Sequence, residues 1–134
     1  MILSDDRKSH FAHIITDVLY EDDLVDFSDD SNALRAAKDG IEFFEVRNIA
    51  RIESSSSYCI LHLISGKNVT VTRLLKDFEE MLLSYRFFRI HHSHLINLDY
   101  IKKYIRSGQV EMENGDLIDV SRRKKEEFLK LLSR

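Results

Sequence analysis

The sequence predicts a mainly β-structured protein with a few short helices, a β-rich α+β fold, preceded by a helical appendage at the N-terminus. Two dipeptides that favour tight hairpin turns, Asp39-Gly40 and Asn114-Gly115, each separate two segments rich in strand-forming residues. The other apolar segments of the body are also short and are bounded by serine, glycine or asparagine, which suits strands better than long helices. The 134 residues are enough for one modest core.

Residues 1–32 are expected to form an acidic leader. Residues 9–20 place apolar side chains at helical spacing, and Ser9 suits the N-cap of that helix. Residues 21–32 lose this periodicity and are predicted to be a linker or an acidic loop. The leader carries nine acidic and two basic residues, a net charge of −7, whereas residues 33–134 carry 18 basic and 14 acidic residues, a net charge of +4. A mildly basic body permits a polyanionic partner.

Strand-forming patterns define the body of the chain. Strands are expected at residues 33–38, 41–46, 49–53, 58–64, 68–71, 100–105, 109–113 and 117–120. The four serines 54–57 and the sequence Ser65-Gly66-Lys67 are expected to form turns between them.

A first body helix is predicted to begin at Thr72 or Arg73 and to end at Leu83. Its apolar stripe consists of Leu74, Leu75, Phe78, Met81 and Leu82. This spacing indicates an amphipathic helix with one buried face.

A second body helix is predicted from about Arg122 to Leu132, with Ser121 as its N-cap. Its apolar contacts are expected from Phe128, Leu129, Leu131 and Leu132. Its first turn carries Arg122, Arg123, Lys124 and Lys125. Cations at this end oppose the helix dipole, so the cluster is typical either of a solvated face or of a helix start that faces phosphate.

Composition limits the cellular setting. The single cysteine, Cys59, cannot form an internal disulfide, so a reducing cytoplasm is expected. No apolar run approaches the ~20 residues that span a bilayer, and residues 1–6 lack the features of a signal peptide. We therefore expect a cytoplasmic protein without a membrane partner.

Residues 87–97 are the most informative segment. They hold Arg89, His91, His92, Ser93, His94 and Asn97 between the apolar pairs Phe87-Phe88 and Leu95-Ile96. Arginine and hydroxyl groups suit phosphate oxygens, and imidazole and amide groups suit phosphates or base edges. The segment indicates a polyanion-binding surface, and the alternative is an ordinary solvated strand end.

A metal site is a further alternative for the same segment. In an extended chain His92 and His94 would share one face, and imidazole is a common metal ligand. No carboxylate or cysteine lies close by in sequence to complete a coordination set, since Cys59 is remote. We therefore expect no metal and no cofactor.

Several phrases taken together resemble the LytTR family of DNA-binding domains. The segment Phe88-Arg89-Ile90-His91-His92-Ser93-His94-Leu95-Ile96-Asn97 matches the family phrase F-R-x-H-x-S-x-x-x-N, and Val120-Ser121-Arg122-Arg123 matches its closing phrase. The resemblance runs from about Ala33 to Leu132. It implies an elongated set of strands with short helices that presents DNA contacts on loops and helix ends, so residues 33–134 are expected to be the DNA-binding domain.

The resemblance also implies roles for individual residues. Base reading is expected from His92, Arg122 and Ser57. Contacts to the DNA backbone are expected from Arg89, His91, Ser93, Arg123, Lys124 and Lys125, the alternative for Arg89 being a structural ion pair. Phe88 and Asn97 are expected to anchor the motif in the fold.

The function implied is sequence-specific binding of double-stranded DNA by a bacterial transcriptional regulator. The protein is expected to be the output domain of a two-component response regulator, partnered by a receiver domain or by a second copy of itself on repeated sites. One alternative is a protein-interaction or sensor module without DNA contact, and another is a hydrolase that uses His91–His94. The hydrolase is disfavoured because the sequence lacks a Gly-rich phosphate loop and a nucleophile elbow, and Asp99 is the nearest carboxylate that could orient the histidines. We therefore expect no enzymatic activity.

Overall fold

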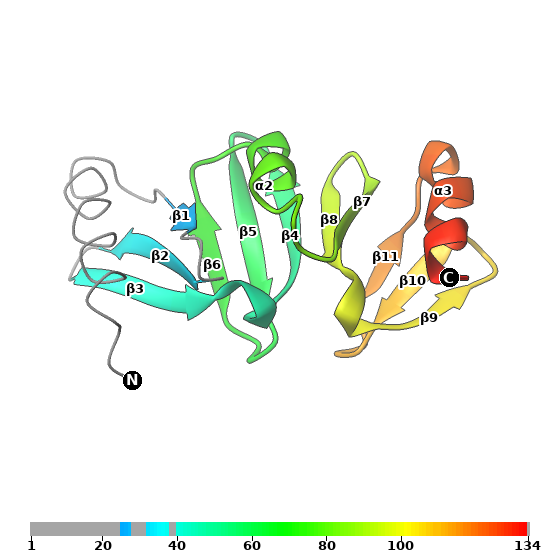
Figure 1. Ribbon diagram of the computed structural model, residues 1–134, viewed down its shortest axis with the longest axis horizontal. Coiled ribbons are helices and arrows are strands. Elements are labelled where there is room, and N and C mark those ends of the chain that lie inside the picture. The colour runs from blue at the N-terminus through cyan, green and yellow to red at the C-terminus, as the bar shows by residue number, and fades with distance from the viewer. Residues whose placement is uncertain (1–24, 28–31, 38–39, 134) are drawn as a thin grey trace.

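The computed structural model describes the backbone of residues 25–27, 32–37 and 40–133 and the side chains of residues 45–133 (Figure 1). Its strands form a three-stranded, a five-stranded and a second three-stranded sheet, which follow one another along the long axis of the molecule. The predicted β-rich fold with short helices is confirmed. The helix expected at residues 9–20 lies outside the described residues.

The first sheet contains short strands at the N-terminal end of the described chain. They are β1 (Val25–Phe27), β2 (Asn32–Ala37) and β3 (Gly40–Glu45). The hairpin predicted around Asp39-Gly40 is confirmed, because β2 and β3 pair antiparallel, but Gly40 is the first residue of β3, opposite Ala37, and not part of the turn. The prediction of a linker or loop over residues 21–32 is wrong for Val25–Phe27, because these residues form β1 and pair with β2. Strand-forming valine and phenylalanine are enough where a neighbouring strand supplies the hydrogen bonds.

The second sheet contains the serine run and the histidine-rich segment. Its strands are β4 (Ile49–Ser55), β5 (Tyr58–Leu63), β6 (Asn68–Val71), β7 (Phe87–His91) and β8 (His94–Asn97), in the spatial order β6-β5-β4-β8-β7. A 3₁₀ turn, η1 (Val46–Asn48), leads into β4. The strands predicted between residues 49 and 71 are confirmed. The predicted serine loop is wrong for Ser54 and Ser55, which pair with Cys59 and Tyr58 and extend β4.

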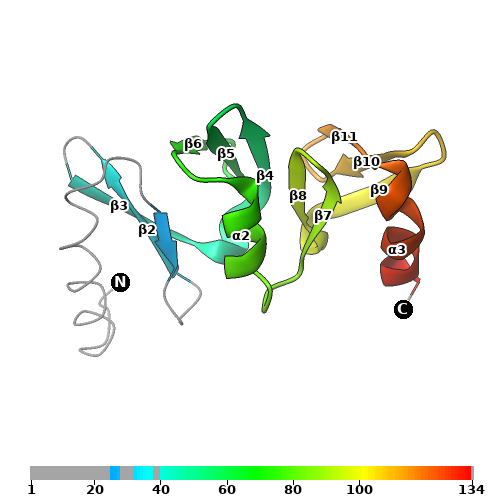
Figure 2. The ribbon, with the colours of Figure 1, turned by 90° about the horizontal axis from the view of Figure 1, so that it is seen from above.

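Helix α2 (Leu75–Met81) covers one face of the second sheet (Figure 2). The core between them consists of Val46, Ile49, Ile52, Cys59, Leu61, Leu63, Val69, Val71, Leu75, Phe78, Leu82 and Leu95. The helix begins later than predicted, because Leu74 is extended, with φ −82° and ψ 148°. An extended residue lies outside the helical period, so Leu74 leaves the apolar stripe and 59% of its surface is exposed.

The third sheet and its helix form the C-terminal end. Its strands are β9 (Ile101–Ile105), β10 (Gln109–Met112) and β11 (Leu117–Asp119), and a 3₁₀ turn, η2 (Leu98–Tyr100), precedes them. The strands predicted here and the Asn114-Gly115 hairpin are confirmed. Gly115 has φ +94°, a backbone conformation that other residues adopt only with strain. The turn signal therefore identified a real conformational requirement.

Helix α3 (Arg122–Leu132) has the bounds that the sequence predicts. Phe128 is fully buried and Leu131 partly so, in a second core with Phe88, Ile90, Ile96, Val110, Met112 and Ile118. The predicted burial of Leu129 and Leu132 is wrong, because they are 36% and 42% exposed. A helix this short buries one narrow stripe, and these two residues lie beside it.

Residues 87–97 fold into a hairpin that the sequence did not signal. β7 and β8 pair antiparallel, with Phe88 opposite Ile96 and His91 opposite His94, so His92 and Ser93 form the turn. The absence of glycine, asparagine or aspartate at the turn removed the usual hairpin signal. Because successive strand residues point to opposite faces, β8 contributes to both cores.

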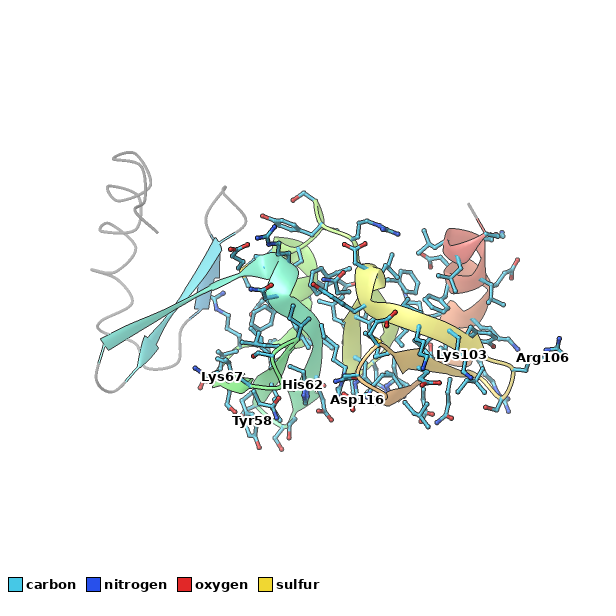
Figure 3. All side chains as sticks on the ribbon, turned by 90° about the horizontal axis from the view of Figure 1, so that it is seen from below. Tyr58, His62, Lys67, Lys103, Arg106 and Asp116 are labelled. Carbon is cyan, nitrogen blue, oxygen red and sulfur yellow. The ribbon has the colours of Figure 1, made fainter. Side chains whose placement is uncertain are left out.

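Opposite α2, the β7–β8 part of the second sheet packs against the third sheet in the second core, whereas β6 exposes Asn68 and Thr70. Figure 3 shows Tyr58, His62, Lys103 and Asp116 projecting on the side away from α2 and α3. In the described part of the chain, the helices are too short or too polar to span a bilayer.

Candidate nucleic-acid interface

Three segments that are distant in sequence meet at one edge of the molecule, the upper edge in Figure 1. The backbone N–H of Ser54 donates to the carbonyl oxygen of Ser93 at 2.9 Å, which ties the β7–β8 turn to β4. The N–H of Ser121 donates to the carbonyl oxygen of Ile90 at 2.8 Å, which ties the start of α3 to β7. We call the edge formed by residues 54–57, 91–94 and 121–125 the turn edge.

The β7–β8 turn is held by side chains as well as by backbone. Arg89 Nη2 donates to the carbonyl oxygen of His92 at 2.7 Å, and Arg89 Nη1 donates to Glu79 Oε1 on α2 at 3.1 Å. The N–H of Ser93 donates to His91 Nδ1 at 3.1 Å. These contacts replace the conformational preference that a glycine or asparagine would have supplied, and they hold the His92 backbone in one position.

Three imidazole rings cluster at this turn. The ring centroid of His91 lies 4.2 Å from that of His92 and 5.4 Å from that of His94. Burial and the neighbouring His92 hold the pKa of His91 below its ordinary value, against the opposing charge of Asp119. Because Nδ1 accepts a hydrogen bond from Ser93, the neutral ring carries its proton on Nε2, which can donate to a ligand.

His94 is the more enclosed of the clustered histidines. Burial and the nearby Arg51 lower its pKa, with Glu53 opposing them in part. Its Nδ1 is buried and has no hydrogen-bond partner among the described residues. The extended geometry that would have put His92 and His94 on one face is wrong, because His92 lies in the hairpin turn and His94 lies in β8. Within the residues whose side chains are described, no group of three or more histidine, cysteine, aspartate or glutamate side chains is placed to hold a metal ion.

A pocket of about 410 Å³ opens between the β7–β8 turn and the start of α3. It is lined by Glu79, Arg89, His91, His92, Ser121, Arg123 and Lys124. The cations outnumber the single carboxylate, and backbone N–H groups at a helix start add positive potential. An anionic group such as a phosphate suits this pocket.

The predicted site residues of α3 do not all face this pocket. Arg123 and Lys124 line it, whereas Arg122 and Lys125 are exposed outside it. Lys124 Nζ lies 5.6 Å from the centroid of the Phe88 ring and 3.9 Å from Glu127 Oε1. Ser121 occupies the N-cap position without a side-chain cap hydrogen bond. Ser121 is also one of the residues that line the pocket.

The two residues expected to anchor the motif are both buried. Phe88 is 8% exposed, and its ring stacks on Phe128 with centroids 5.7 Å apart. Asn97 is 3% exposed; its Nδ2 donates to the carbonyl oxygen of Ile49 at 3.0 Å, and its Oδ1 accepts from the N–H of Asp99 at 3.0 Å. The amide thus bridges β8 to the start of β4.

Ser57 lies at the tip of the β4–β5 turn and is exposed. The residue before it, Ser56, has φ 56°, in the left-handed region. Sequence reasoning missed Glu79 and Asp119, which interact with Arg89 and His91. Both are surface acids in unremarkable positions, and only their spatial neighbours distinguish them.

The fold and this edge define a β-rich domain that presents polar turns and a basic helix start on one side. Residues 39–133 match the family model described as the LytTr DNA-binding domain, and the chain belongs to this family. The resemblance seen in the sequence is confirmed. The family is one of DNA-binding domains and is not defined by an enzymatic reaction.

One solved structure to which the chain is similar is the LytTr DNA-binding domain of a protein described as a methyl-accepting/DNA response regulator from Bacillus cereus. The two sequences are 24% identical, the TM-score is 0.66, and the likeness covers 78% of this chain and 98% of that one. This likeness shows the shared fold. The comparison with curated proteins found no match.

Proposed function

We propose that this protein binds duplex DNA at specific sequences through its turn edge, as the output domain of a transcriptional regulator. The observation that carries the proposal is the convergence of the β7–β8 turn and the basic start of α3 around one cationic pocket. A protruding turn and a helix start can both enter a groove, and the pocket between them suits a backbone phosphate. Membership of a DNA-binding family supports the same function.

Within this site we assign base reading to the exposed side chains. His92, Arg122 and Ser57 are all exposed at the turn edge. No ion pair or hydrogen bond of the Arg122 side chain occurs within the described part of the chain, so its guanidinium is available to guanine O6 and N7. Arg89 holds the carbonyl oxygen of His92, and the His92 ring lies against that of His91 with centroids 4.2 Å apart, which favours one presentation of the ring to a base.

We assign contacts with the DNA backbone to His91, Ser93, Arg123, Lys124 and Lys125. Arg123 and Lys124 line the pocket, which favours phosphate between them. Arg89 contributes positive charge to this set, but its guanidinium is engaged with Glu79 and with the His92 carbonyl. It therefore acts mainly by holding the turn.

We further propose that the protein serves a two-component system, with a receiver domain or a second copy of itself as partner. The similar domain from Bacillus cereus is described as part of a response regulator. A cytoplasmic location is part of the same proposal, because a regulator that binds DNA must reach the chromosome. The acidic leader, residues 1–32, is assigned no DNA contact, because its net charge of −7 repels phosphates. A truncation that removes residues 1–24 spares β1 and is expected to bind DNA at least as well as the full chain.

The test is selection of bound duplexes from a random library, followed by titration of the selected and scrambled duplexes at several salt concentrations. Affinity is expected to fall steeply with salt on both duplexes and to be much higher on the selected one. A protein-interaction module without DNA contact would enrich no sequence and would show no salt-dependent binding.

A further inference from the structure

We propose that Glu79 is a positioning residue that sets the DNA specificity of the turn edge through Arg89. The inference rests on the proposed function and concerns a residue that is neither a cation nor part of the histidine-rich segment. Glu79 lies on α2 and places its carboxylate in the pocket that is otherwise lined by cations and imidazoles. An acid there opposes phosphate binding, so its position in this pocket indicates a role other than holding phosphate.

A relay of two hydrogen bonds connects Glu79 to the β7–β8 turn. Glu79 Oε1 accepts from Arg89 Nη1 at 3.1 Å, and Arg89 Nη2 donates to the carbonyl oxygen of His92 at 2.7 Å. The guanidinium is planar and rigid, so fixing one terminal nitrogen fixes the direction of the other. Glu79 thereby directs Arg89 at the His92 carbonyl and connects the turn to α2.

The two residues of the turn, His92 and Ser93, are held by different hydrogen bonds. Ser93 is bonded on both sides, through its N–H to His91 Nδ1 and through its carbonyl oxygen to the N–H of Ser54. His92 is held by the carbonyl contact from Arg89. The relay from Glu79 therefore fixes the residue that we assign to base reading.

The charge of Glu79 has a second consequence. Its side chain is 38% exposed and that of Arg89 is 26% exposed, so both face the space that a phosphate would occupy. The carboxylate offsets the charge of Arg89 in this pocket and weakens attraction to any DNA backbone. Non-specific binding depends on that attraction, whereas specific binding also depends on turn geometry. Glu79 thus lowers affinity for random DNA while preserving affinity for the correct site.

The experiment compares Glu79→Gln with Glu80→Gln. Glu80 is the next residue of α2, it is exposed, and its carboxylate makes no hydrogen bond or ion pair within the described part of the chain. Glu80→Gln therefore removes the same formal charge as Glu79→Gln without breaking such an interaction. Binding to a selected and to a scrambled duplex is measured over a range of salt concentrations. Glu79→Gln is expected to reduce the ratio of the two affinities by about fivefold and to steepen the salt dependence on scrambled DNA. Glu80→Gln is expected to change both affinities equally.

Two further measurements separate positioning from charge. The backbone amide resonances of His92 and Ser93 in the free protein are expected to shift in Glu79→Gln and to stay in place in Glu80→Gln. Arg89→Lys keeps the positive charge but loses the planar guanidinium that bonds Glu79 and the His92 carbonyl at the same time. This variant is expected to bind the selected duplex more weakly and the scrambled duplex as well as the wild type does.

The inference is overturned if Glu79→Gln and Glu80→Gln change both affinities alike, or if the turn resonances do not move. It is also overturned if Arg89→Lys preserves the ratio, since the effect would then be one of charge alone. Failure of the proposed function is distinguishable, because the wild-type protein would then show no preference between the duplexes. The resonance measurement on the free protein tests the relay even in that case.

Discussion

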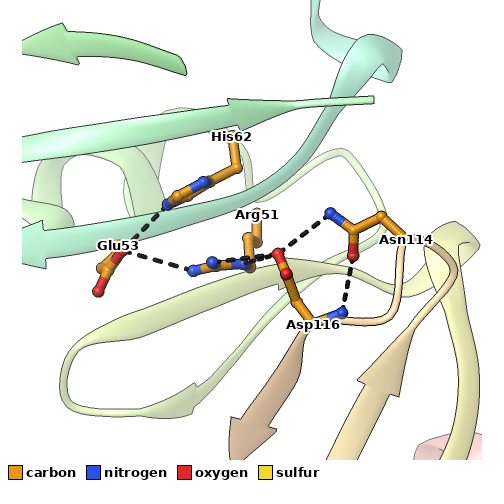
Figure 4. A network of polar contacts seen from close by, with 5 residues as sticks. All are labelled: Arg51, Glu53, His62, Asn114 and Asp116. Atoms are coloured by element: carbon orange, nitrogen blue, oxygen red, sulfur yellow. Dashed lines mark hydrogen bonds and ion pairs between the residues drawn. The ribbon is translucent and has the colours of Figure 1, made fainter. Parts of the chain in front are cut away.

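Arg51 on β4 donates two hydrogen bonds to one carboxylate oxygen of Asp116, from Nε at 3.3 Å and from Nη2 at 3.2 Å (Figure 4). Asp116 follows the glycine of the β10–β11 turn, so the pair joins the second sheet to the third. Arg51 Nη1 also lies 3.6 Å from Glu53 Oε1, and the same carboxylate oxygen lies 3.0 Å from His62 Nε2. Since β4 leads into the 56–57 turn and the third sheet leads into α3, this network fixes the spacing between two parts of the turn edge.

Removing the Arg51 guanidinium is expected to destabilise the fold. In Arg51→Met the apolar stem remains but Asp116 and Glu53 lose their cation, which is expected to lower the free energy of unfolding by about 1–3 kcal/mol. Denaturant unfolding of Arg51→Met, Asp116→Asn and the double variant gives the coupling energy between the two residues. Glu113→Gln, an exposed acid in the same turn, is the control and is expected to change little. Additive effects of the two substitutions would contradict a direct interaction.

Stability is expected to fall in acid in a way that depends on Glu53. Burial by itself raises the pKa of this carboxyl, but the hydrogen bond with His62 and the positive charge of Arg51 outweigh it and hold the pKa below its ordinary 4.5. The unfolded chain therefore binds the proton more tightly. The stabilisation is complete above about pH 4.5 and is lost as pH falls through the lower pKa of the folded state. Thermal unfolding from pH 6 to pH 3 is expected to show a shallower decline for Glu53→Gln than for the wild type, and equal declines would refute the assignment.

Cys59 is expected to be unreactive in the folded protein. Burial, its main environmental influence, raises the pKa of the thiol to about 11, against the partial opposition of Arg89. The side chain is fully buried in the core under α2. Modification by a thiol reagent near pH 8 is expected to be slow in native buffer and rapid in denaturant. Rapid native labelling would show that this core opens locally.

His92 and Arg122 are expected to determine sequence preference. Alanine at either position should cost about 1–3 kcal/mol on the selected duplex and much less on scrambled DNA, because base contacts exist only on the correct site. Arg106→Ala is the control for the arginine, since Arg106 is exposed on the β9–β10 turn and is not one of the residues that form the turn edge. Equal losses on the two duplexes would reduce these residues to contacts with the DNA backbone.

Lys124 is expected to contact phosphate without regard to sequence. Lys124→Gln should weaken binding to selected and scrambled duplexes alike and should lower the slope of log affinity against log salt by about one. The same measurement on Lys103→Gln provides the control, since Lys103 is an exposed lysine of β9 whose Nζ lies 3.7 Å from Glu111 Oε1. An unchanged slope would show that Lys124 does not contact phosphate and has only a structural role through Phe88 and Glu127.

The local elements were well determined by the sequence. The Asn114-Gly115 turn, the strands on either side of it and both ends of α3 were predictable, because each depends on residues that are neighbours in the chain. Errors arose where a neighbouring strand supplied the hydrogen bonds, as for β1 and for Ser54 and Ser55 of β4. Strand pairing is a property of two segments, and a single segment carries only part of the information.

Some features of the candidate site were also predictable from the sequence, and others depended on tertiary structure. The residue types in residues 87–97 and 120–125 indicated a polyanion surface, because the side-chain chemistry is inherent in the sequence. The hairpin turn at His92-Ser93, the pocket shared with α3 and the pairing of Arg89 with Glu79 depended on tertiary structure. Each requires the simultaneous burial of residues that are far apart in the chain, such as Leu95 under α2 and Ile96 under α3. That burial decides which polar groups meet at the surface, and no local pattern of residues encodes it.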